Sequence, residues 1–269
     1  MTTILYAVLA VTVIGLVCAV LLVVAGKFMA VPVDEKFEKV RACLPGANCG
    51  ACGYAGCDGY ASALASGACA ETTLCVPGGD TAAADVAAAL GVEAGTVQKK
   101  VAFISCNGTC SNTRNKFEYE GTQTCAGAEI MFGGPGECTF GCMGFGDCQR
   151  ACQYDAICIE NGIAHVDPRI CKGCGACAKA CPNHLIHILP ADIAYFVTCG
   201  NQEKGAMTRQ RCTNGCIGCK RCEKACETGA ITVNNNLASI DYEKCIGCGK
   251  CAEVCTVGCI AALVSNQNA

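Results

Sequence analysis

The chain has 269 residues, 30 of them cysteine, and a formal net charge of −3. So many thiols leave three roles, namely disulfides, zinc sites and iron–sulfur clusters, and the mild acidity excludes a strongly basic nucleic-acid-binding protein. Because the chain has 32 glycines, no tryptophan and only 6% aromatic residues, we expect bound metal rather than a large apolar core to organise much of the fold.

Residues 1–26 predict a transmembrane anchor. The apolar run from Ile4 to Ala25 is long enough for one helical span. A cleaved signal peptide would need a basic start and a shorter apolar stretch, and neither is present. Basic residues follow the run and none precedes it, so the cysteine-rich body is expected on the cytoplasmic side. We therefore expect a single-pass protein of the cell (inner, or cytoplasmic) membrane.

Residues 31–91 predict a small domain with one 4Fe–4S cluster. The stretch NCGACGYAGC places three cysteines at two- and four-residue spacings, and a fourth lies in CVPGG. Short helices are expected over residues 34–42, 60–66 and 80–91. A zinc knuckle is the alternative for these thiols, and Cys43 and Cys69 are interpreted as lying outside the set. The predicted cluster ligands are Cys49, Cys52, Cys57 and Cys75.

A repeat of 74 residues organises the rest of the chain. That offset carries Cys142, Cys148 and Cys152 onto Cys216, Cys222 and Cys226, and it carries the run that starts at Cys171 onto the run that starts at Cys245. The pattern indicates a tandem duplication. We expect a first ferredoxin domain over 135–190, a linker over 191–198 and a second ferredoxin domain over 199–269. A β-hairpin is expected inside each, over 156–167 and 230–241.

Each repeat holds two cysteine runs, which is the arrangement of a two-cluster ferredoxin. In such ferredoxins the fourth cysteine of each run ligates the other cluster. The rule predicts three complete ligand sets, which are Cys152, Cys171, Cys174 and Cys177; Cys216, Cys219, Cys222 and Cys255; and Cys226, Cys245, Cys248 and Cys251.

The fourth run, CMGFGDCQRAC, has Phe145 where a ligand is expected. Three outcomes are open, namely a three-iron cluster, an empty site, or completion by a nearby thiol. Cys138 lies four residues before Cys142, and the repeat has Cys212 at the corresponding position. We therefore favour a site made of Cys138, Cys142, Cys148 and Cys181.

A cysteine-containing insert or linker is expected over 96–134. It contributes Cys106, Cys110 and Cys125, and the 74-residue offset carries Cys125 onto Cys199. These thiols suggest a sixth cluster, with Cys138, Cys199 or Cys212 as the fourth ligand, although spare thiols are the alternative. The sequence thus predicts five 4Fe–4S clusters, or six. Cys158 and Cys259 have no cysteine counterpart in the repeat and are interpreted as incidental.

Nothing in the sequence predicts a catalytic residue. No nucleotide-binding fingerprint is present, and the three histidines are scattered without a nucleophile–base pair. Thiolate-bound clusters carry electrons without an open substrate site. The sequence therefore predicts an electron relay, not a nucleic-acid-binding protein, whose partners carry out the chemistry.

The order of segments resembles the B subunit of the Rnf complex over nearly the whole chain. The resemblance rests on the apolar start, NCGACGYAGC with CVPGG, and the paired ferredoxin runs. It implies an α+β fold with one N-terminal transmembrane helix, a four-cysteine cluster domain and two tandem bacterial-type ferredoxin domains.

The family's activity implies a relay subunit of a translocase, a ferredoxin:NAD⁺ oxidoreductase coupled to Na⁺ or H⁺ transport. Reduced ferredoxin would be the donor, and the other membrane and NAD-binding subunits would be partners. Two alternatives stay open. One is a polyferredoxin-like adaptor of a membrane hydrogenase or formate dehydrogenase, and the other is a zinc-binding interaction protein.

Overall fold

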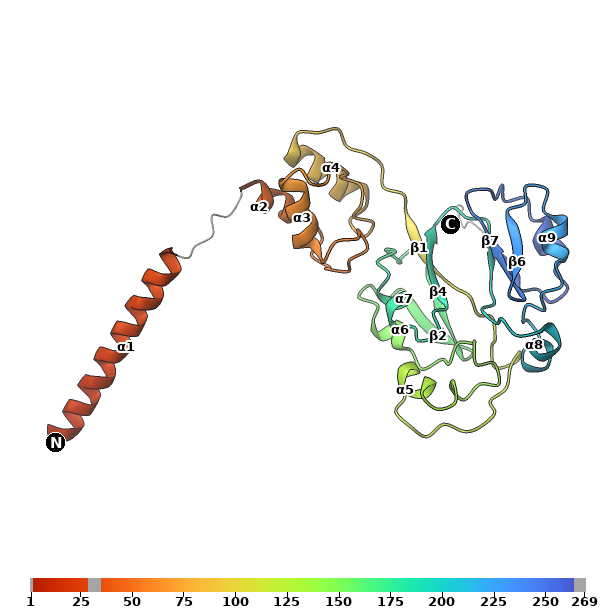
Figure 1. Ribbon diagram of the computed structural model, residues 1–269, viewed down its shortest axis with the longest axis horizontal. Coiled ribbons are helices and arrows are strands. Elements are labelled where there is room, and N and C mark those ends of the chain that lie inside the picture. The colour runs from red at the N-terminus through yellow and green to blue at the C-terminus, as the bar shows by residue number, and fades with distance from the viewer. Residues whose placement is uncertain (1, 29–34, 264–269) are drawn as a thin grey trace.

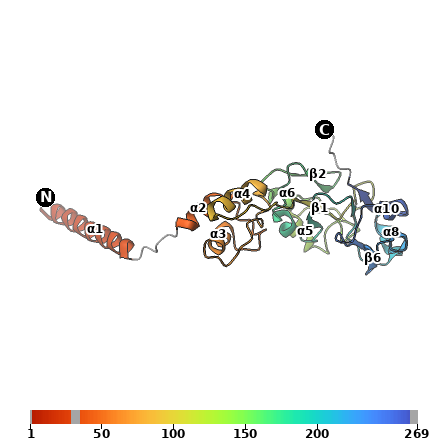
Figure 2. The ribbon, with the colours of Figure 1, turned by 90° about the horizontal axis from the view of Figure 1, so that it is seen from above.

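The structure is a computed structural model that describes residues 2–28 and 35–263 (Figure 1). Behind the N-terminal helix, a three-helix module and two small α+β units follow one another along the molecule, an order also visible from above in Figure 2. The predicted α+β class is therefore observed for the part of the chain after residue 34.

Helix α1 (Thr2–Phe28) forms over the predicted apolar segment, and its described large apolar side chains are exposed. Side chains at several positions between residues 2 and 10, and over residues 26–28, lie outside the described part, as does residue 1. Among the residues that are described, no helix combines the length and apolar character needed to cross a membrane. The expected transmembrane span over residues 1–26 is therefore not supported by the structure.

Three helices form the module that follows. Tyr60 is almost completely buried between them, and its hydroxyl donates to the Glu71 carbonyl oxygen at 2.7 Å. The last helix ends at Gly91 in the left-handed conformation (φ 71°), as expected from the sequence. The helices are α2 (Glu35–Ala42), α3 (Cys57–Ala65) and α4 (Gly79–Leu90). All three predicted helices are confirmed to within three residues.

The first unit contains two antiparallel strand pairs. The expected hairpin forms from β2 (Ile157–Glu160) and β3 (Ile163–Val166). The second pair joins β1 (Lys100–Ile104), which lies in the predicted linker, to β4 (Ile186–Pro190) at the end of the unit. Three short helices complete the unit, namely α5 (Cys125–Glu129), α6 (Asp147–Arg150) and α7 (Ala176–Ala180).

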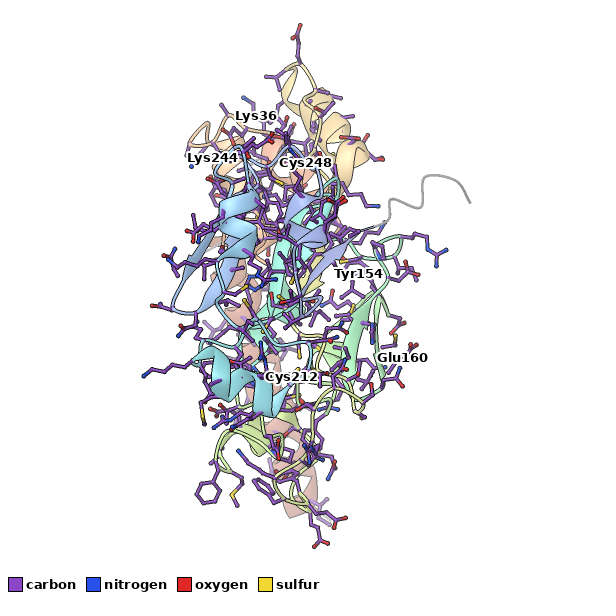
Figure 3. All side chains as sticks on the ribbon, turned by 90° about the vertical axis from the view of Figure 1, so that its right-hand side faces the viewer. Lys36, Tyr154, Glu160, Cys212, Lys244 and Cys248 are labelled. Carbon is purple, nitrogen blue, oxygen red and sulfur yellow. The ribbon has the colours of Figure 1, made fainter. Side chains whose placement is uncertain are left out.

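The second unit repeats this architecture. The expected hairpin forms from β6 (Ile231–Asn234) and β7 (Leu237–Ile240), and β5 (Tyr195–Val197) pairs with β8 (Ile260–Ala262). Its helices are α8 (Gly205–Arg211), α9 (Arg221–Ala225) and α10 (Lys250–Glu253). Figure 3 views the body from this end and labels Lys244 and Cys248.

Strand register extends the repeat further toward the N-terminus than the cysteine pattern does. Ile104 pairs with Ile186, and Val197 pairs with Ile260. Since Ile186 and Ile260 are 74 positions apart, Ile104 and Val197 are structural counterparts although they are 93 positions apart. The first unit therefore contains 19 additional residues. The 74-residue offset is wrong before that insertion, so the counterpart of Cys199 is Cys106 and not Cys125.

The two units contact one another at β1 of the first unit and β5 of the second. Phe103 and Phe196 are counterparts under the 93-residue offset, and their ring centroids are 5.4 Å apart. The strand-to-loop hydrogen bonds match as well, because Ser105 N donates to Leu185 O at 2.8 Å and Thr198 N donates to Cys259 O at 2.8 Å. Because these counterparts are in direct contact, the two units are related by an approximate two-fold axis. The loops that follow Phe103 and Phe196 lie beside that axis.

Candidate iron–sulfur sites

Three of the predicted four-thiol sets each line one small cavity. The cavity of the first unit measures about 10 Å³, and those of the second unit measure about 20 Å³ each. Each set combines three cysteines of one run with one cysteine of the other. They are Cys152, Cys171, Cys174 and Cys177; Cys216, Cys219, Cys222 and Cys255; and Cys226, Cys245, Cys248 and Cys251.

Glycines shape the loops that carry these thiols. Gly144, in the interrupted run, has φ +74°, and a Cβ there would lie 2.6 Å from the Gly162 carbonyl oxygen at the hairpin turn. Gly218 in the second unit makes the corresponding approach to Asn236. The hairpin thus fixes the path of each cysteine loop, because only glycine tolerates both the conformation and the contact.

Gly144→Ala is therefore expected to displace the loop between Cys142 and Cys148. We expect up to about four iron atoms per chain to be lost, since one cubic cluster contains four. The measurement is iron content per chain after anaerobic purification. Gly136→Ala is the matched control, because its Cβ would meet no atom closer than 3.6 Å. Full iron content in Gly144→Ala would contradict the constraint.

The interrupted run has a complete set of four thiols, but with a different fourth member from the predicted one. Cys125, Cys142, Cys148 and Cys181 line one cavity of about 20 Å³, and Cys138 is not among its lining residues. The structure thus brings Cys125 to the place where a ligand at position 145 would be expected.

The insertion, which lies between Cys106 and Cys138, is held over this cavity by contacts with the interrupted run. The ring of Tyr119 packs against Phe145 with centroids 5.4 Å apart. Arg150 donates to the carbonyl oxygens of Phe145 at 2.9 Å and Gln123 at 3.4 Å. The residue that replaces the ligand therefore anchors the segment that leads to Cys125.

Helix α5 then fixes the Cys125 side chain. Thr124 caps the helix, because its hydroxyl accepts from Gly127 N at 3.0 Å. The Asp147 carboxylate accepts from Ala126 N at 2.9 Å and so ties the first turn to the cysteine loop. Cys125 is buried as a result.

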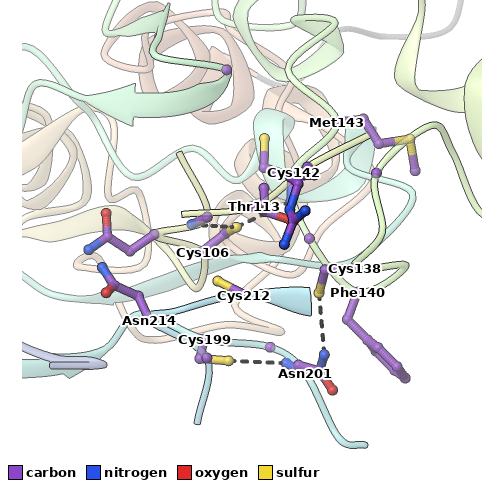
Figure 4. Close-up of a pocket in the computed structure, with 18 of the residues that line it drawn as sticks. Cys106, Thr113, Cys138, Phe140, Cys142, Met143, Cys199, Asn201, Cys212 and Asn214 are labelled. Carbon is purple, nitrogen blue, oxygen red and sulfur yellow. Dashed lines mark hydrogen bonds between the residues drawn. The ribbon is translucent and has the colours of Figure 1, made fainter. Parts of the chain in front are cut away.

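A larger open cavity of about 370 Å³ lies between the two units (Figure 4). Its walls carry Cys106, Cys110, Cys138 and Cys142 from the first unit and Cys199 and Cys212 from the second. Of these, Cys142 also lines the cavity of the interrupted run. Cys106 and Cys199 are counterparts under the 93-residue offset, and Cys138 and Cys212 are counterparts under the 74-residue offset. Four thiols in two matched pairs therefore surround the approximate two-fold axis.

Backbone donors point at the sulfurs in the same symmetric way. Cys106 Sγ accepts from Gly108 N at 3.4 Å and from Cys142 N at 3.3 Å. Cys199 Sγ accepts from Asn201 N at 3.4 Å and from Cys216 N at 3.2 Å. N–H···S bonds of this kind stabilise cluster thiolates.

The sequence named this set only in part. Of the thiols suggested for a sixth cluster, Cys106, Cys138, Cys199 and Cys212 line the inter-unit cavity, although Cys138 was favoured for the interrupted run. Cys110 also lines it but is exposed. Cys125 lies at the other site. The sequence did contain a signal of the insertion. Cys138 lies 32 residues after Cys106, whereas its counterpart Cys212 lies only 13 residues after Cys199.

The N-terminal module gathers its four predicted thiols around α3. Cys57 and Cys75 are buried, and Asn48 fixes the start of α3 by accepting from Cys57 N at 2.9 Å. Burial, followed by the charges of Cys57, Cys52 and Cys49, raises the pKa of Cys75. Cys52 packs against the same buried cluster as Cys57 and Cys75. The thiols interpreted as spare make other contacts, Cys43 to Lys39 O at 3.2 Å and Cys69 to Glu71 O at 3.7 Å.

Burial disfavours the thiolate form of several thiols at these sites in the absence of metal. It raises the pKa of Cys106 and Cys148 to about 12, and the pKa of Cys177, Cys199 and Cys222 to about 11. Cationic iron would favour the thiolates that burial disfavours. Within the described residues, no three His, Cys, Asp or Glu side chains converge on a single ion.

One of these cavities has a fifth thiol that the sequence did not single out. Cys259 lines the cavity of Cys216 and lies with its Sγ 3.6 Å from Cys255 Sγ. A hydrogen bond from Cys259 lowers the pKa of Cys216 to about 6. The repeat gave no signal for Cys259, because the corresponding residue of the first unit is Leu185.

Neighbouring sites are linked by direct contacts. Cys142 and Cys216 each donate their backbone N–H to a thiol of the inter-unit cavity while lining the adjacent smaller cavity. At the other end, Lys179 Nζ donates to Cys49 O at 2.9 Å and joins the helical module to the first unit. Tyr154 lies at the same junction, where burial, followed by the charges of Cys174 and Cys49, raises its pKa.

Three family models match these segments. They are an Fe–S cluster family at residues 44–77, a 4Fe-4S binding domain at 164–187 and a 4Fe-4S dicluster domain at 215–259. Each match covers thiols that the structure gathers. The fold and sites therefore define a multi-cluster iron–sulfur protein.

Relatives identify the family more closely. The B subunit of a Na⁺-translocating ferredoxin:NAD⁺ oxidoreductase complex from Acetobacterium woodii is 43% identical over 86% of this chain and 70% of that protein. A proton-translocating counterpart from Clostridium ljungdahlii is 37% identical over 90% of this chain and 85% of that protein. The B subunit of an ion-translocating oxidoreductase complex from Methanosarcina acetivorans is 37% identical over 86% and 88%. This chain belongs to the B-subunit family of these Rnf complexes.

Proposed function

We propose that this chain is the electron-relay subunit of an Rnf-type ferredoxin:NAD⁺ oxidoreductase that is coupled to Na⁺ or H⁺ translocation. It accepts electrons from reduced ferredoxin and passes them to membrane subunits. The observation that carries the proposal is the series of thiol-lined sites in the two units, beside the four-cysteine helical module. The family supports the same function, since its members are named as subunits of such complexes.

The proposed cofactors are six 4Fe–4S clusters, which when bound supply one-electron redox chemistry. Four ligand sets are those predicted from the sequence, including Cys49, Cys52, Cys57 and Cys75. For the interrupted run the proposed ligands are Cys125, Cys142, Cys148 and Cys181, and for the cavity between the units they are Cys106, Cys138, Cys199 and Cys212. Four thiols at each site and the N–H donors to sulfur suit such clusters.

The two ends of the series of sites suggest the direction in which electrons move. In the second unit, Cys219 and Cys248 are exposed, so a soluble donor can approach the sites that they line. The helical module at the other end follows α1 in the chain. We therefore assign ferredoxin to the second unit and the membrane subunits to the helical module.

The proposal includes attachment to the membrane through residues 4–25. The uninterrupted apolar run and the exposed apolar side chains of α1 support it. Truncation of residues 1–28 is expected to move the chain from the membrane fraction to the soluble fraction, as measured by immunoblotting after ultracentrifugation. Retention of the truncated chain in membranes would show that other contacts hold it there.

Metal analysis of the anaerobically purified chain tests the proposed cofactors. We expect roughly 24 iron atoms and as many sulfides per chain, four for each cluster, with little zinc. Predominant zinc would instead support an interaction protein. Reduced ferredoxin should bleach the visible absorbance rapidly, and failure to do so would favour an adaptor for a hydrogenase or formate dehydrogenase.

A further inference from the structure

The side chain of Asn201 lies at the cavity between the units, and it is only 2% exposed. Its backbone N–H donates to Cys199 Sγ at 3.4 Å, and its side-chain Nδ2 donates to Cys138 Sγ at 3.3 Å (Figure 4). Cys199 belongs to the second unit and Cys138 to the first. One residue therefore donates to a thiol of each unit.

The orientation of this amide is fixed by its other partners. Asn201 Oδ1 accepts from Glu203 N at 2.7 Å and lies 3.4 Å from the buried Thr208 hydroxyl. Because a backbone N–H can only donate, the atom facing Glu203 N must be the oxygen. The NH₂ group is then the end that faces Cys138.

The symmetry of the site isolates the contribution of this side chain. Under the 93-residue offset the counterpart of Asn201 is Gly108, which makes the matching backbone N–H···S bond to Cys106. A Cβ at position 108 would lie 3.4 Å from Cys106 Sγ and 3.8 Å from Cys212 Sγ, so a side chain there would start beside the thiol that corresponds to Cys138. Because glycine has no side chain, the first unit lacks a side-chain donor at this position. The two halves of the site thus share the backbone donors and differ in the amide.

We propose that Asn201 is a positioning residue that raises the reduction potential of the cluster held between the two units, by donating its side-chain N–H to Cys138. The inference rests on the proposed function, which places a cluster at these four thiols. On reduction the cluster gains one electron from an external donor, and no bond is formed or broken. The added negative charge strengthens an N–H···S bond, so the donor stabilises the reduced form more than the oxidised form.

The test is a redox titration of the full chain with dithionite, followed by EPR. The double variant Cys106→Ser/Cys199→Ser first identifies the signal of the inter-unit cluster, because that signal should disappear. If no signal and no iron is lost, the proposed cluster itself is absent, and this outcome is distinct from a failure of the role of Asn201.

Asn201→Ala is expected to lower the equilibrium constant for reduction of that one cluster about tenfold, which is 59 mV for a one-electron couple. Thr208→Val is the control, because it removes a hydroxyl beside the same amide and leaves the donor to sulfur in place. An unchanged potential in Asn201→Ala at full iron content, or a shift equal to that of Thr208→Val, would overturn the proposal.

Gly108→Asn tests the same effect by adding a side-chain amide instead of removing one. It tests the role of side-chain donation even if Asn201→Ala loses iron. Its Cβ would lie 3.4 Å from Cys106 Sγ, an ordinary contact, so the backbone at position 108 has room for a Cβ. The added amide should raise the potential of the same signal. If Gly108→Asn keeps its iron and the potential does not rise, donation from these two positions does not control the cluster.

Discussion

Replacing Cys125 with serine is expected to destroy the four-iron cluster of the interrupted run or to convert it to a three-iron form. Cys125 is buried in the wall of the cavity that also holds Cys142, Cys148 and Cys181, and Phe145 cannot serve as a ligand. Loss of the cluster would remove about four iron atoms per chain, and conversion would remove about one. Iron analysis and EPR of the oxidised protein distinguish the two results.

Cys138→Ser is the informative comparison, because the sequence favoured Cys138, and not Cys125, as the fourth ligand of this run. The structure places Cys138 in the cavity between the units, where Asn201 donates to it. The two variants should therefore alter different EPR signals, and the double variant should show both changes. If Cys138→Ser removed the signal expected for Cys125→Ser, the assignment of the interrupted run would be reversed.

The double variant Cys106→Ser/Cys199→Ser should interrupt the succession of sites between the two units. It removes one thiol contributed by each unit while leaving every thiol of the smaller cavities in place. We expect a loss of about four iron atoms. Clusters of the second unit should still be reduced rapidly by ferredoxin, whereas those of the first unit and the helical module should be reduced much more slowly. Stopped-flow absorbance and rapid-freeze EPR measure the two phases.

The control for this variant is Cys158→Ser. Cys158 is exposed on β2 and its thiol hydrogen-bonds Glu160 at 3.4 Å, away from the cavities. Its iron content and reduction kinetics should be those of the unaltered chain. Uniform, rapid reduction in Cys106→Ser/Cys199→Ser would show that electrons bypass the inter-unit site.

Much of the architecture could be predicted because its determinants are local or repeated. The spacing within each cysteine run predicted three of the thiol sets that line single cavities. The polar turn at Asn161 and Gly162 and its counterpart predicted both hairpins. Gly91 predicted the end of α4. In each case the relevant residues lie close together in the chain or recur at one offset.

The pairing of β1 with β4 could not be predicted from local spacing or from the repeat. The partners are more than 80 positions apart, and β1 lies in a segment that the cysteine pattern suggested was a linker. Because the 19-residue insertion follows Cys106, the 74-residue offset matched Cys199 to Cys125 instead. The strand register corrected the alignment, and the inter-unit site followed from it.

The sequence by itself determined that this chain is a thiol-rich protein of tandem ferredoxin units, which of its cysteines form runs, and which run lacks a ligand at Phe145. Only the tertiary structure decided which distant thiol completes that run. Tyr119, Asp147 and Arg150 hold the insertion over the site, so Cys125 lines its cavity and Cys138 does not. The physical reason is that spacing along the chain fixes ligands within a loop, whereas ligands from separate segments are brought together only by strand pairing and packing.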